Sequence, residues 1–220
     1  MFRIHKAGWI IIRNLLLGLI VLNLPLLYLF HLNAVSIIVL IASTLLLIFV
    51  LRFFRHPNRV VISEKDILVA PADGKVVVVE EIVDDEMIGG PCIQVSIFMS
   101  VWNVHINWIP FNGVIKYFKH HHGQFLVALE PKSSTLNERT SLMIETESGV
   151  KIGLKQIAGY VARRIETYIT KNETEVKRGQ ELGFIKFGSR VDILLPVGTE
   201  VLVKPGDKAI GCITPIAKMK

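Results

Sequence analysis

Two long apolar runs near the N-terminus constrain the fold of this chain most strongly. Asn14–Phe30 and Ala34–Leu51 contain no Asp, Glu, Lys or Arg, and a short polar segment, 31–33, separates them. Eighteen helical residues span roughly 27 Å, which is close to the hydrocarbon thickness of a bilayer. The sequence therefore predicts a hairpin of two membrane helices, with Pro25 bending the first.

Basic residues flank the apolar runs on both sides and predict their orientation. These residues are Arg3, Lys6, Arg13, Arg52, Arg55 and Arg59. By the positive-inside rule both ends of the hairpin face the cytoplasm. A monotopic hairpin that enters one leaflet is the alternative, whereas a cleaved signal peptide fits less well because a second apolar run follows at once. In either arrangement the rest of the chain is expected at the cytoplasmic side of the cell membrane.

Charge and cysteine content narrow the class of protein. Residues 1–55 carry five of the net +6 charges and no acidic residue. A nucleic-acid-binding protein would spread its basic residues over the folded domain, so we expect no nucleic-acid partner. Cys92 and Cys212 are the only cysteines, and their wide separation suits neither a disulfide framework nor a zinc site. We expect reduced thiols.

From residue 56 onward the apolar runs become short, rich in Val and Ile, and bounded by Gly, Pro, Asn and Asp. Many short strands with regular turns predict a mostly β fold, a barrel or sandwich. The expected strands are 75–83, 92–99, 114–118, 125–129, 141–145, 151–157, 159–165, 182–187, 191–195 and 201–203, with a helical turn possible only in 133–139. The expected domains are a membrane hairpin, 1–55, and a β-rich, barrel-sandwich-like domain, 56–220.

Two turn passages, 176–183 and 203–211, share a valine, a basic residue, a Gly turn and a strand that ends in Gly. They resemble the hairpins of barrel-sandwich hybrid domains, which carry biotin or lipoate on a lysine. Asp207-Lys208-Ala209 matches such a tip over three residues. A membrane-tethered carrier modified on Lys208 is therefore one alternative function, and an adaptor with an apolar hairpin and a β-domain is another.

The segment Lys186-Phe187-Gly188-Ser189-Arg190 places a Gly-Ser pair between two cations and two expected strands. Such a pair alone is most often a turn. A serine hydroxyl beside an unhindered glycine carbonyl can also attack that carbonyl when a base activates it. The segment resembles the processing site of the short-type phosphatidylserine decarboxylases, where the backbone breaks between Gly and Ser and the Ser becomes a pyruvoyl group.

His105 is the candidate base for the Ser189 hydroxyl. The segment 98–110 resembles the family block Phe-Leu-Ser-x-x-Asp-Val-His-x-Asn-Arg-x-Pro, with Asn107 in place. Asn103 replaces the usual Asp, and Trp108 replaces the Arg of short-type members or the second His of long-type members. The resemblance thus implies that His105 serves both self-processing and decarboxylation, or that a water replaces the second histidine.

The remaining histidines offer weaker candidates. His120, His121 and His122 are consecutive, which permits a metal-binding hypothesis. Adjacent residues of a strand point to opposite faces, however, so an exposed polar run is favoured and no metal is expected.

Two further blocks extend the resemblance from about residue 53 to the C-terminus. Asp73 lies in a Pro-x-Asp-Gly sequence that the family has at this place, although Asp-Gly is also an ordinary turn pair. The implied set is Asp73, His105 and Ser189, with the logic of a serine triad. The segment 122–139 resembles a Gly-Lys-Phe … Asn-Glu-Arg region in which Gln124 replaces Lys, and we expect residues 137–139 to support the site structurally.

The resemblance implies a two-stage mechanism. Cleavage after Gly188 would give subunits 1–188 and 189–220 of about 21 and 3.6 kDa, which remain associated as a heterodimer. The pyruvoyl cofactor on residue 189 would form a Schiff base with phosphatidylserine and release carbon dioxide and phosphatidylethanolamine. Lys186 and Arg190 are the nearest cations for the phosphate of this phospholipid substrate, or else they form a solvated strand edge.

Overall fold

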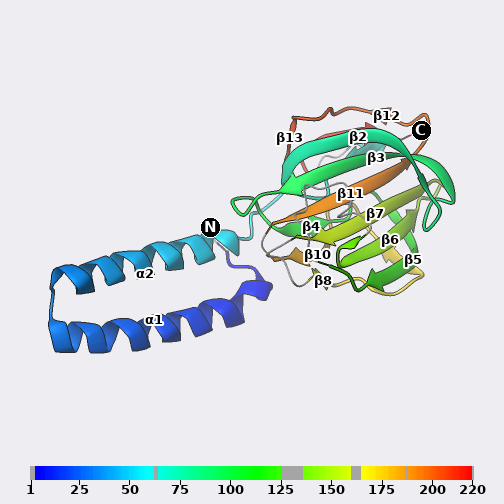
Figure 1. Ribbon diagram of the computed structural model, residues 1–220. Coiled ribbons are helices and arrows are strands. Elements are labelled where there is room, and N and C mark those ends of the chain that lie inside the picture. The colour runs from blue at the N-terminus through cyan, green and yellow to red at the C-terminus, as the bar shows by residue number, and fades with distance from the viewer. Residues whose placement is uncertain (1–2, 62–63, 125–135, 160–164, 187, 220) are drawn as a thin grey trace. The chain divides into compact units, whose positions relative to one another are not determined.

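The computed structural model describes residues 3–61, 64–124, 136–159, 165–186 and 188–219. The chain folds as two units, residues 1–57 and 58–220 (Figure 1). The division lies two residues beyond the boundary expected from composition.

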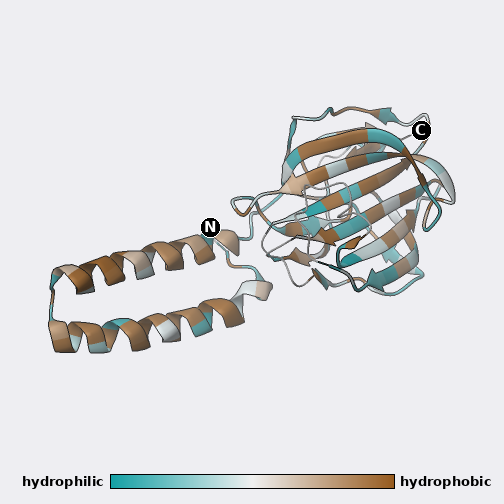
Figure 2. Ribbon diagram, in the orientation of Figure 1, coloured by the Kyte–Doolittle hydropathy of each residue, from teal (hydrophilic) through white to brown (hydrophobic). Residues whose placement is uncertain are grey.

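The first unit is a helical hairpin. A short 3-10 helix, η1 (Lys6–Gly8), leads into α1 (Trp9–Phe30), and α2 (Ala34–Phe53) returns. Asn33 caps α2 by accepting a hydrogen bond from the Ser36 backbone N–H at 2.9 Å, which satisfies a donor that the first helical turn leaves open. Pro25 lies inside α1, and the helix continues through it. Both helices are apolar along their length (Figure 2), and each is long and apolar enough to cross a membrane.

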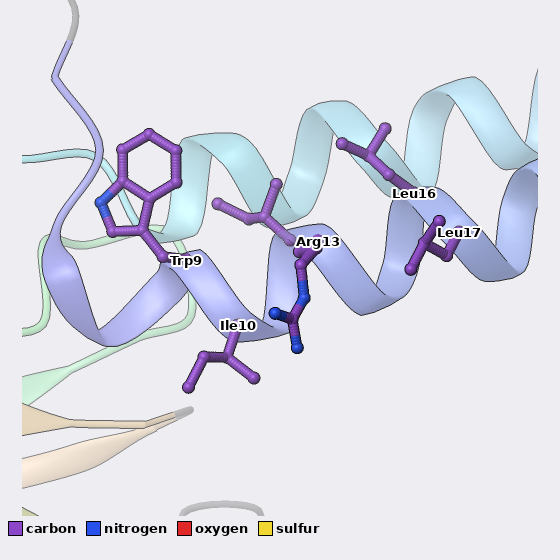
Figure 3. A pocket seen from close by; sticks show the side chains of 6 residues that line it. Trp9, Ile10, Arg13, Leu16 and Leu17 are labelled. Atoms are coloured by element: carbon purple, nitrogen blue, oxygen red, sulfur yellow. The ribbon is translucent and has the colours of Figure 1, made fainter.

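Polar side chains are rare within the hairpin, and one pair joins the two helices. Asn23 of α1 donates to the Ser43 hydroxyl of α2 at 3.0 Å and to the Leu19 carbonyl at 2.8 Å. Such interhelical hydrogen bonds stabilise helix pairs in apolar surroundings. On the side of α1 near its start lies an apolar groove that also includes Arg13 (Figure 3). The basic Arg13 so close to the helix start agrees with a flank at the membrane interface.

The second unit is built from antiparallel strands. Among its described residues these strands are β1 (Ile67–Val69), β2 (Gly74–Asp84), β3 (Gly90–Met99), β4 (Ile106–Trp108), β5 (Gly113–His121), β6 (Arg139–Glu145), β7 (Lys151–Ala158), β8 (Ile165–Thr167), β9 (Thr174–Val176), β10 (Glu181–Ile185), β11 (Ser189–Pro196), β12 (Glu200–Val201), β13 (Lys208–Ala209) and β14 (Pro215–Lys218). An eight-stranded sheet has the order β13-β2-β3-β11-β7-β6-β5-β9, and two three-stranded sheets have the orders β1-β14-β12 and β4-β10-β8. The mostly β fold is confirmed, but the described strands do not close into a barrel.

Strand β11 is an interior strand of the large sheet, between β3 and β7 (Figure 1). Its inner face contributes Val191, Ile193 and Leu195 to the main hydrophobic core. Side chains alternate along a strand, so Arg190, Asp192 and Leu194 lie on the other face, where Leu194 packs in a second apolar cluster. The first residue of β11 is Ser189, and both of its neighbouring strands pair with it there.

The expected long strands correspond to β2, β3, β5, β6, β7, β10 and β11, with ends shifted by a few residues. The expected strand 125–129 lies outside the described residues, as do most of the expected strand 159–165 and residues 133–135 of the segment 133–139. The short strands β1, β4, β9, β13 and β14 were not expected. Each is four residues or fewer and is defined by its pairing with a partner strand, which the local sequence does not reveal.

Candidate active site

The Gly188–Ser189 bond lies where the chain enters β11. Gly188 adopts φ +69°, a conformation that side-chain-bearing residues rarely adopt. Ser189 is fully buried and pairs with Met99 of β3 and Ala158 of β7. Its hydroxyl oxygen is buried without a hydrogen-bond partner among the described residues. A buried unsatisfied hydroxyl is costly, and it leaves a nucleophile free to react.

His105 lies directly against this bond. The fully buried imidazole accepts a hydrogen bond at Nε2 from the Gly188 backbone N–H at 3.2 Å. Its Nδ1 lies 3.1 Å from the Asn103 carbonyl oxygen. A carbonyl only accepts, so Nδ1 carries the proton, and this tautomer leaves the Nε2 lone pair directed at the cleavage segment.

The backbone around His105 is fixed by strand pairing. Its carbonyl accepts from the Ile185 N–H at 3.2 Å, and β4, which follows directly, pairs with β10. The segments 105–108 and 181–185 therefore form one small sheet that ends beside the Gly188–Ser189 bond. The structure thus brings together His105, Gly188 and Ser189, which are far apart in the sequence.

Asp73 forms a different set of contacts from those expected. Its carboxylate accepts hydrogen bonds from Arg59 Nη2 at 2.9 and 2.7 Å and from the Gly211 N–H at 2.8 Å. The side chain is mostly buried, with 12% exposed. The backbone of the same loop reaches β4, because the Trp108 N–H donates to the Pro71 carbonyl at 2.8 Å.

The two cations beside the cleavage site are both engaged in ion pairs. Lys186 Nζ lies 2.6 Å from Glu166 and is 18% exposed. The Arg190 side chain is 1% exposed, and its Nε lies 2.8 Å from the fully buried Asp192 carboxylate. A phosphate could reach Arg190 only if that buried pair opened, whereas Lys186 lies nearer the surface.

A buried polar chain beneath the site was not found from the sequence. Asn107 donates from Nδ2 to the Met99 sulfur at 3.6 Å and accepts from Gln156 at 2.7 Å. Gln156 in turn accepts from the hydroxyls of Thr140 and Thr167 at 2.8 and 3.0 Å. Asn107 belongs to the quoted motif, but the segment of Gln156, β7, gives no local signal of a buried amide network.

The segment 137–139 lies on the other side of Ser189. Asn137 is fully buried and donates to the Ala158 carbonyl at 2.7 Å, and the Ala158 N–H donates to the Glu138 carbonyl at 2.9 Å. Since Ala158 pairs with Ser189, these contacts support the strand next to the candidate nucleophile.

The histidine triplet lies on β5 and just beyond it. His121 Nε2 is 2.5 Å from Glu86, and His120 is 3.6 Å from Glu138. Burial alone would raise the pKa of Glu86, but the hydrogen bonds from His121, Tyr117 and Ser141 and the charge of His121 together outweigh burial and lower that pKa below its ordinary value. Among the described residues, no group of three or more His, Cys, Asp or Glu side chains could hold a metal ion.

Both cysteines are buried and reduced. Desolvation raises the pKa of the Cys212 thiol to about 12, and burial also raises the pKa of Cys92. Protonated thiols are poor nucleophiles, so neither side chain competes with Ser189 as a reactive group.

Comparison with known proteins shows the family to which the chain belongs. The phosphatidylserine decarboxylase family model matches residues 46–214. The chain is 47% identical over 220 residues to a phosphatidylserine decarboxylase proenzyme of Amoebophilus asiaticus, covering 100% of this chain and 97% of that protein. It is 43% identical over 218 residues to a proenzyme of the same name from Parabacteroides distasonis, covering 99% of each. The chain belongs to the phosphatidylserine decarboxylase family.

The carrier alternative is not favoured by these findings. The family match includes Lys208, which lies in β13 and pairs with Lys75 of β2. A lysine that carries biotin or lipoate must project from a free hairpin tip, whereas the backbone at Lys208 is part of a sheet.

Proposed function

We propose that this chain cleaves its own backbone between Gly188 and Ser189 and then decarboxylates phosphatidylserine to phosphatidylethanolamine through a pyruvoyl group formed from Ser189. Family membership supports the reaction, and the term proenzyme in the names of its relatives supports a cleaved precursor. The observation that carries the assignment of residues is the contact of 3.2 Å between His105 Nε2 and the Gly188 N–H, beside the unpartnered Ser189 hydroxyl.

Self-cleavage begins with proton transfer from the Ser189 hydroxyl to His105 Nε2. The Gly188 N–H occupies that nitrogen in the precursor, so the Ser189 side chain must rotate towards it as the Gly188 hydrogen bond loosens. The serine oxygen then attacks the Gly188 carbonyl carbon, and the C–N bond breaks as the nitrogen takes up a proton. The amide thereby becomes an ester.

Elimination completes the cleavage. Loss of the Ser189 α-proton expels the Gly188 carboxylate from the β-carbon and leaves dehydroalanine at the new N-terminus. Addition of one water and loss of one ammonia convert it to the pyruvoyl ketone. His105 is the base within reach for the proton transfers, and the glycine at 188 leaves the carbonyl uncrowded by a side chain.

The fragments are expected to remain one molecule. In the chain 189–220, β11 pairs with β3 and β7, β13 with β2, and β14 with β1, all of them strands of the chain 1–188. Removing an interior strand would expose the core on its inner face, so hydrophobic burial holds the heterodimer together.

The residues around Ser189 fit a pyruvoyl group because that side chain is fully buried and its hydroxyl has no hydrogen-bond partner in the described part of the chain. The ketone supplies an acceptor for the electrons that remain when carbon dioxide leaves the substrate. His105 would return a proton to the reacting carbon. Lys186 is the better placed contact for the lipid phosphate, because its side chain is partly exposed. Arg190 is buried and paired with Asp192, so it would not contact the phosphate directly.

Access to the buried site follows from cleavage. Once the Gly188–Ser189 bond is broken, Gly188 becomes a free chain end beside His105 and can move away from residue 189. The hairpin would keep the active domain at the membrane where its lipid substrate resides, and the basic flanks favour the cytoplasmic side.

The test compares wild-type protein with Ser189→Ala, which keeps the strand and removes the hydroxyl. Wild type should separate into two fragments on a denaturing gel and release carbon dioxide from phosphatidylserine vesicles. The Ala variant should remain one chain and be inactive. Release of carbon dioxide by an uncleaved Ala variant would show that the assignment of Ser189 is wrong.

A further inference from the structure

Arg59 has no part in the scheme above, but it contacts Asp73, the carboxylate that the family resemblance implies for the site. It lies just after the hairpin in the sequence. Its Nη2 donates to both carboxylate oxygens of Asp73, at 2.9 and 2.7 Å. The two side chains are 16% and 12% exposed, and a charge-assisted hydrogen bond in such partly buried surroundings fixes the carboxylate far better than an exposed one.

The guanidinium is held on a second side by an aromatic ring. Arg59 Cζ lies 5.9 Å from the centroid of the Trp108 ring, within the range of a cation–π contact. The same ring packs on Gly211, where a Cβ atom would lie 2.3 Å from Trp108 Cζ3. Gly211 in turn donates its N–H to Asp73 at 2.8 Å. Arg59, Asp73, Trp108 and Gly211 thus close a ring of contacts, here termed the Asp73 clamp.

The clamp joins segments from both sides of the cleavage site. Arg59, Asp73 and Trp108 precede Gly188, whereas Gly211 belongs to the fragment that begins at residue 189. Trp108 also lies in β4, three residues after His105. The clamp therefore fixes the Asp73 carboxylate relative to the strand that positions the candidate base and to the fragment that carries the nucleophile.

Arg59 is oriented so that it binds Asp73, and this orientation leaves one of its own donors unsatisfied. Its Nε is buried and has no hydrogen-bond partner among the described residues. An unsatisfied buried donor is unfavourable, and such compromises are expected where a side chain is held for function rather than for stability. From this geometry we infer that Arg59 is a positioning residue for self-cleavage, which acts by holding the Asp73 carboxylate. This inference rests on the proposed function and on the role in self-cleavage that the family resemblance implies for Asp73.

The test follows cleavage of the full chain made by cell-free synthesis in phospholipid nanodiscs. Arg59→Ala should slow the appearance of the two fragments about 10- to 100-fold, as expected for loss of a charge-assisted hydrogen bond. Arg59→Lys should recover part of the rate. Millimolar guanidinium should accelerate Arg59→Ala and leave Asp73→Asn unchanged, because only the first variant retains the carboxylate and an empty place for the cation.

Arg178→Ala is the matched control, since Arg178 also binds across loops, to the carbonyls of Glu64 and Ile67. It should cleave at the wild-type rate. Thermal unfolding of each variant in an uncleavable Ser189→Ala background shows whether the precursor is folded. If Arg59→Ala is unfolded, the cleavage rate of Arg59→Lys tests the inference instead.

The inference is overturned if folded Arg59→Ala cleaves at the wild-type rate, or if folded Arg59→Lys does so when Arg59→Ala does not fold. It is also overturned if Arg178→Ala slows cleavage as much as Arg59→Ala does. Absence of guanidinium rescue in a folded, slow Arg59→Ala would overturn it as well. A wild-type chain that does not cleave at all would instead contradict the proposed function, so the two failures are distinguishable.

Discussion

Asp73 and Asp84 occupy similar ion pairs in two regions of the β-rich unit. Asp73 accepts from Arg59 and the Gly211 N–H. Asp84 accepts from Lys155 at 2.6 Å and from the backbone N–H groups of Met87 and Ile88. The Asp73 contacts link segments on both sides of the cleavage site, whereas the Asp84 contacts fasten the turn between β2 and β3 onto the sheet. Buried charge alone therefore does not identify a functional residue, whereas the segments that its contacts join can indicate one.

The largest effect should follow from removing the candidate base. His105→Gln should slow self-cleavage by about 10²- to 10⁴-fold, the usual contribution of a general base. His121→Gln is the matched control, because His121 is paired with Glu86 away from the cleavage site. Cleavage is followed by the fraction of intact precursor over time. Similar rates for His105→Gln and wild type would remove His105 from the site.

The same Asp→Asn substitution should affect the cleavage rate at one aspartate and the stability at the other. Asp73→Asn should slow cleavage of the folded precursor, because the site loses the carboxylate that Arg59 holds. Asp84→Asn should lower the free energy of unfolding by about 3 kcal/mol, since it leaves Lys155 buried without a counter-ion, and should leave the cleavage rate of folded protein unchanged. The measurements are fragment formation and denaturant unfolding. Slower cleavage in folded Asp84→Asn and an unchanged cleavage rate in folded Asp73→Asn would contradict the different roles assigned to the two residues.

The fold was more predictable than the site. Alternating Val and Ile runs defined the long strands, and uncharged length defined the hairpin. The pair Arg190–Asp192 follows the two-residue period of a strand and was readable in principle. The contacts of Arg59 and Gln156 could not be predicted, because each residue meets its partners only after distant segments pack. Arg59 lies 14 positions from Asp73, and Gln156 lies 49 positions from Asn107.

Acid should weaken the Asp84 region in a predictable direction. Burial would raise the pKa of Asp84, but the Lys155 hydrogen bond and backbone N–H groups outweigh it, so the folded pKa lies below the unfolded value of 3.8. The pair therefore contributes its full stability above that value and loses it as pH falls through the folded pKa. The thermal unfolding temperature should fall less steeply between pH 6 and about pH 3 in Asp84→Asn than in wild type. An identical decline would show that Asp84 does not contribute.

The smallest effect is expected at the rim of the site. Lys186→Gln should raise KM for phosphatidylserine vesicles about 2- to 5-fold with little change in kcat, since a partly exposed cation contributes at most ~1 kcal/mol. Lys116→Gln, which removes an exposed lysine paired with Glu173, should leave KM unchanged. A change in kcat alone would place Lys186 in the chemistry instead of in phosphate binding.

The most direct test of the account is the intact mass of purified protein from the membrane fraction. The account predicts two associated chains, 1–188 and 189–220, whose masses sum to that of the precursor plus one water minus one ammonia. The smaller chain should have no free N-terminal amine and should gain mass with borohydride or an amine reagent. Active protein whose backbone is unbroken between Gly188 and Ser189, with no carbonyl to trap, would contradict it.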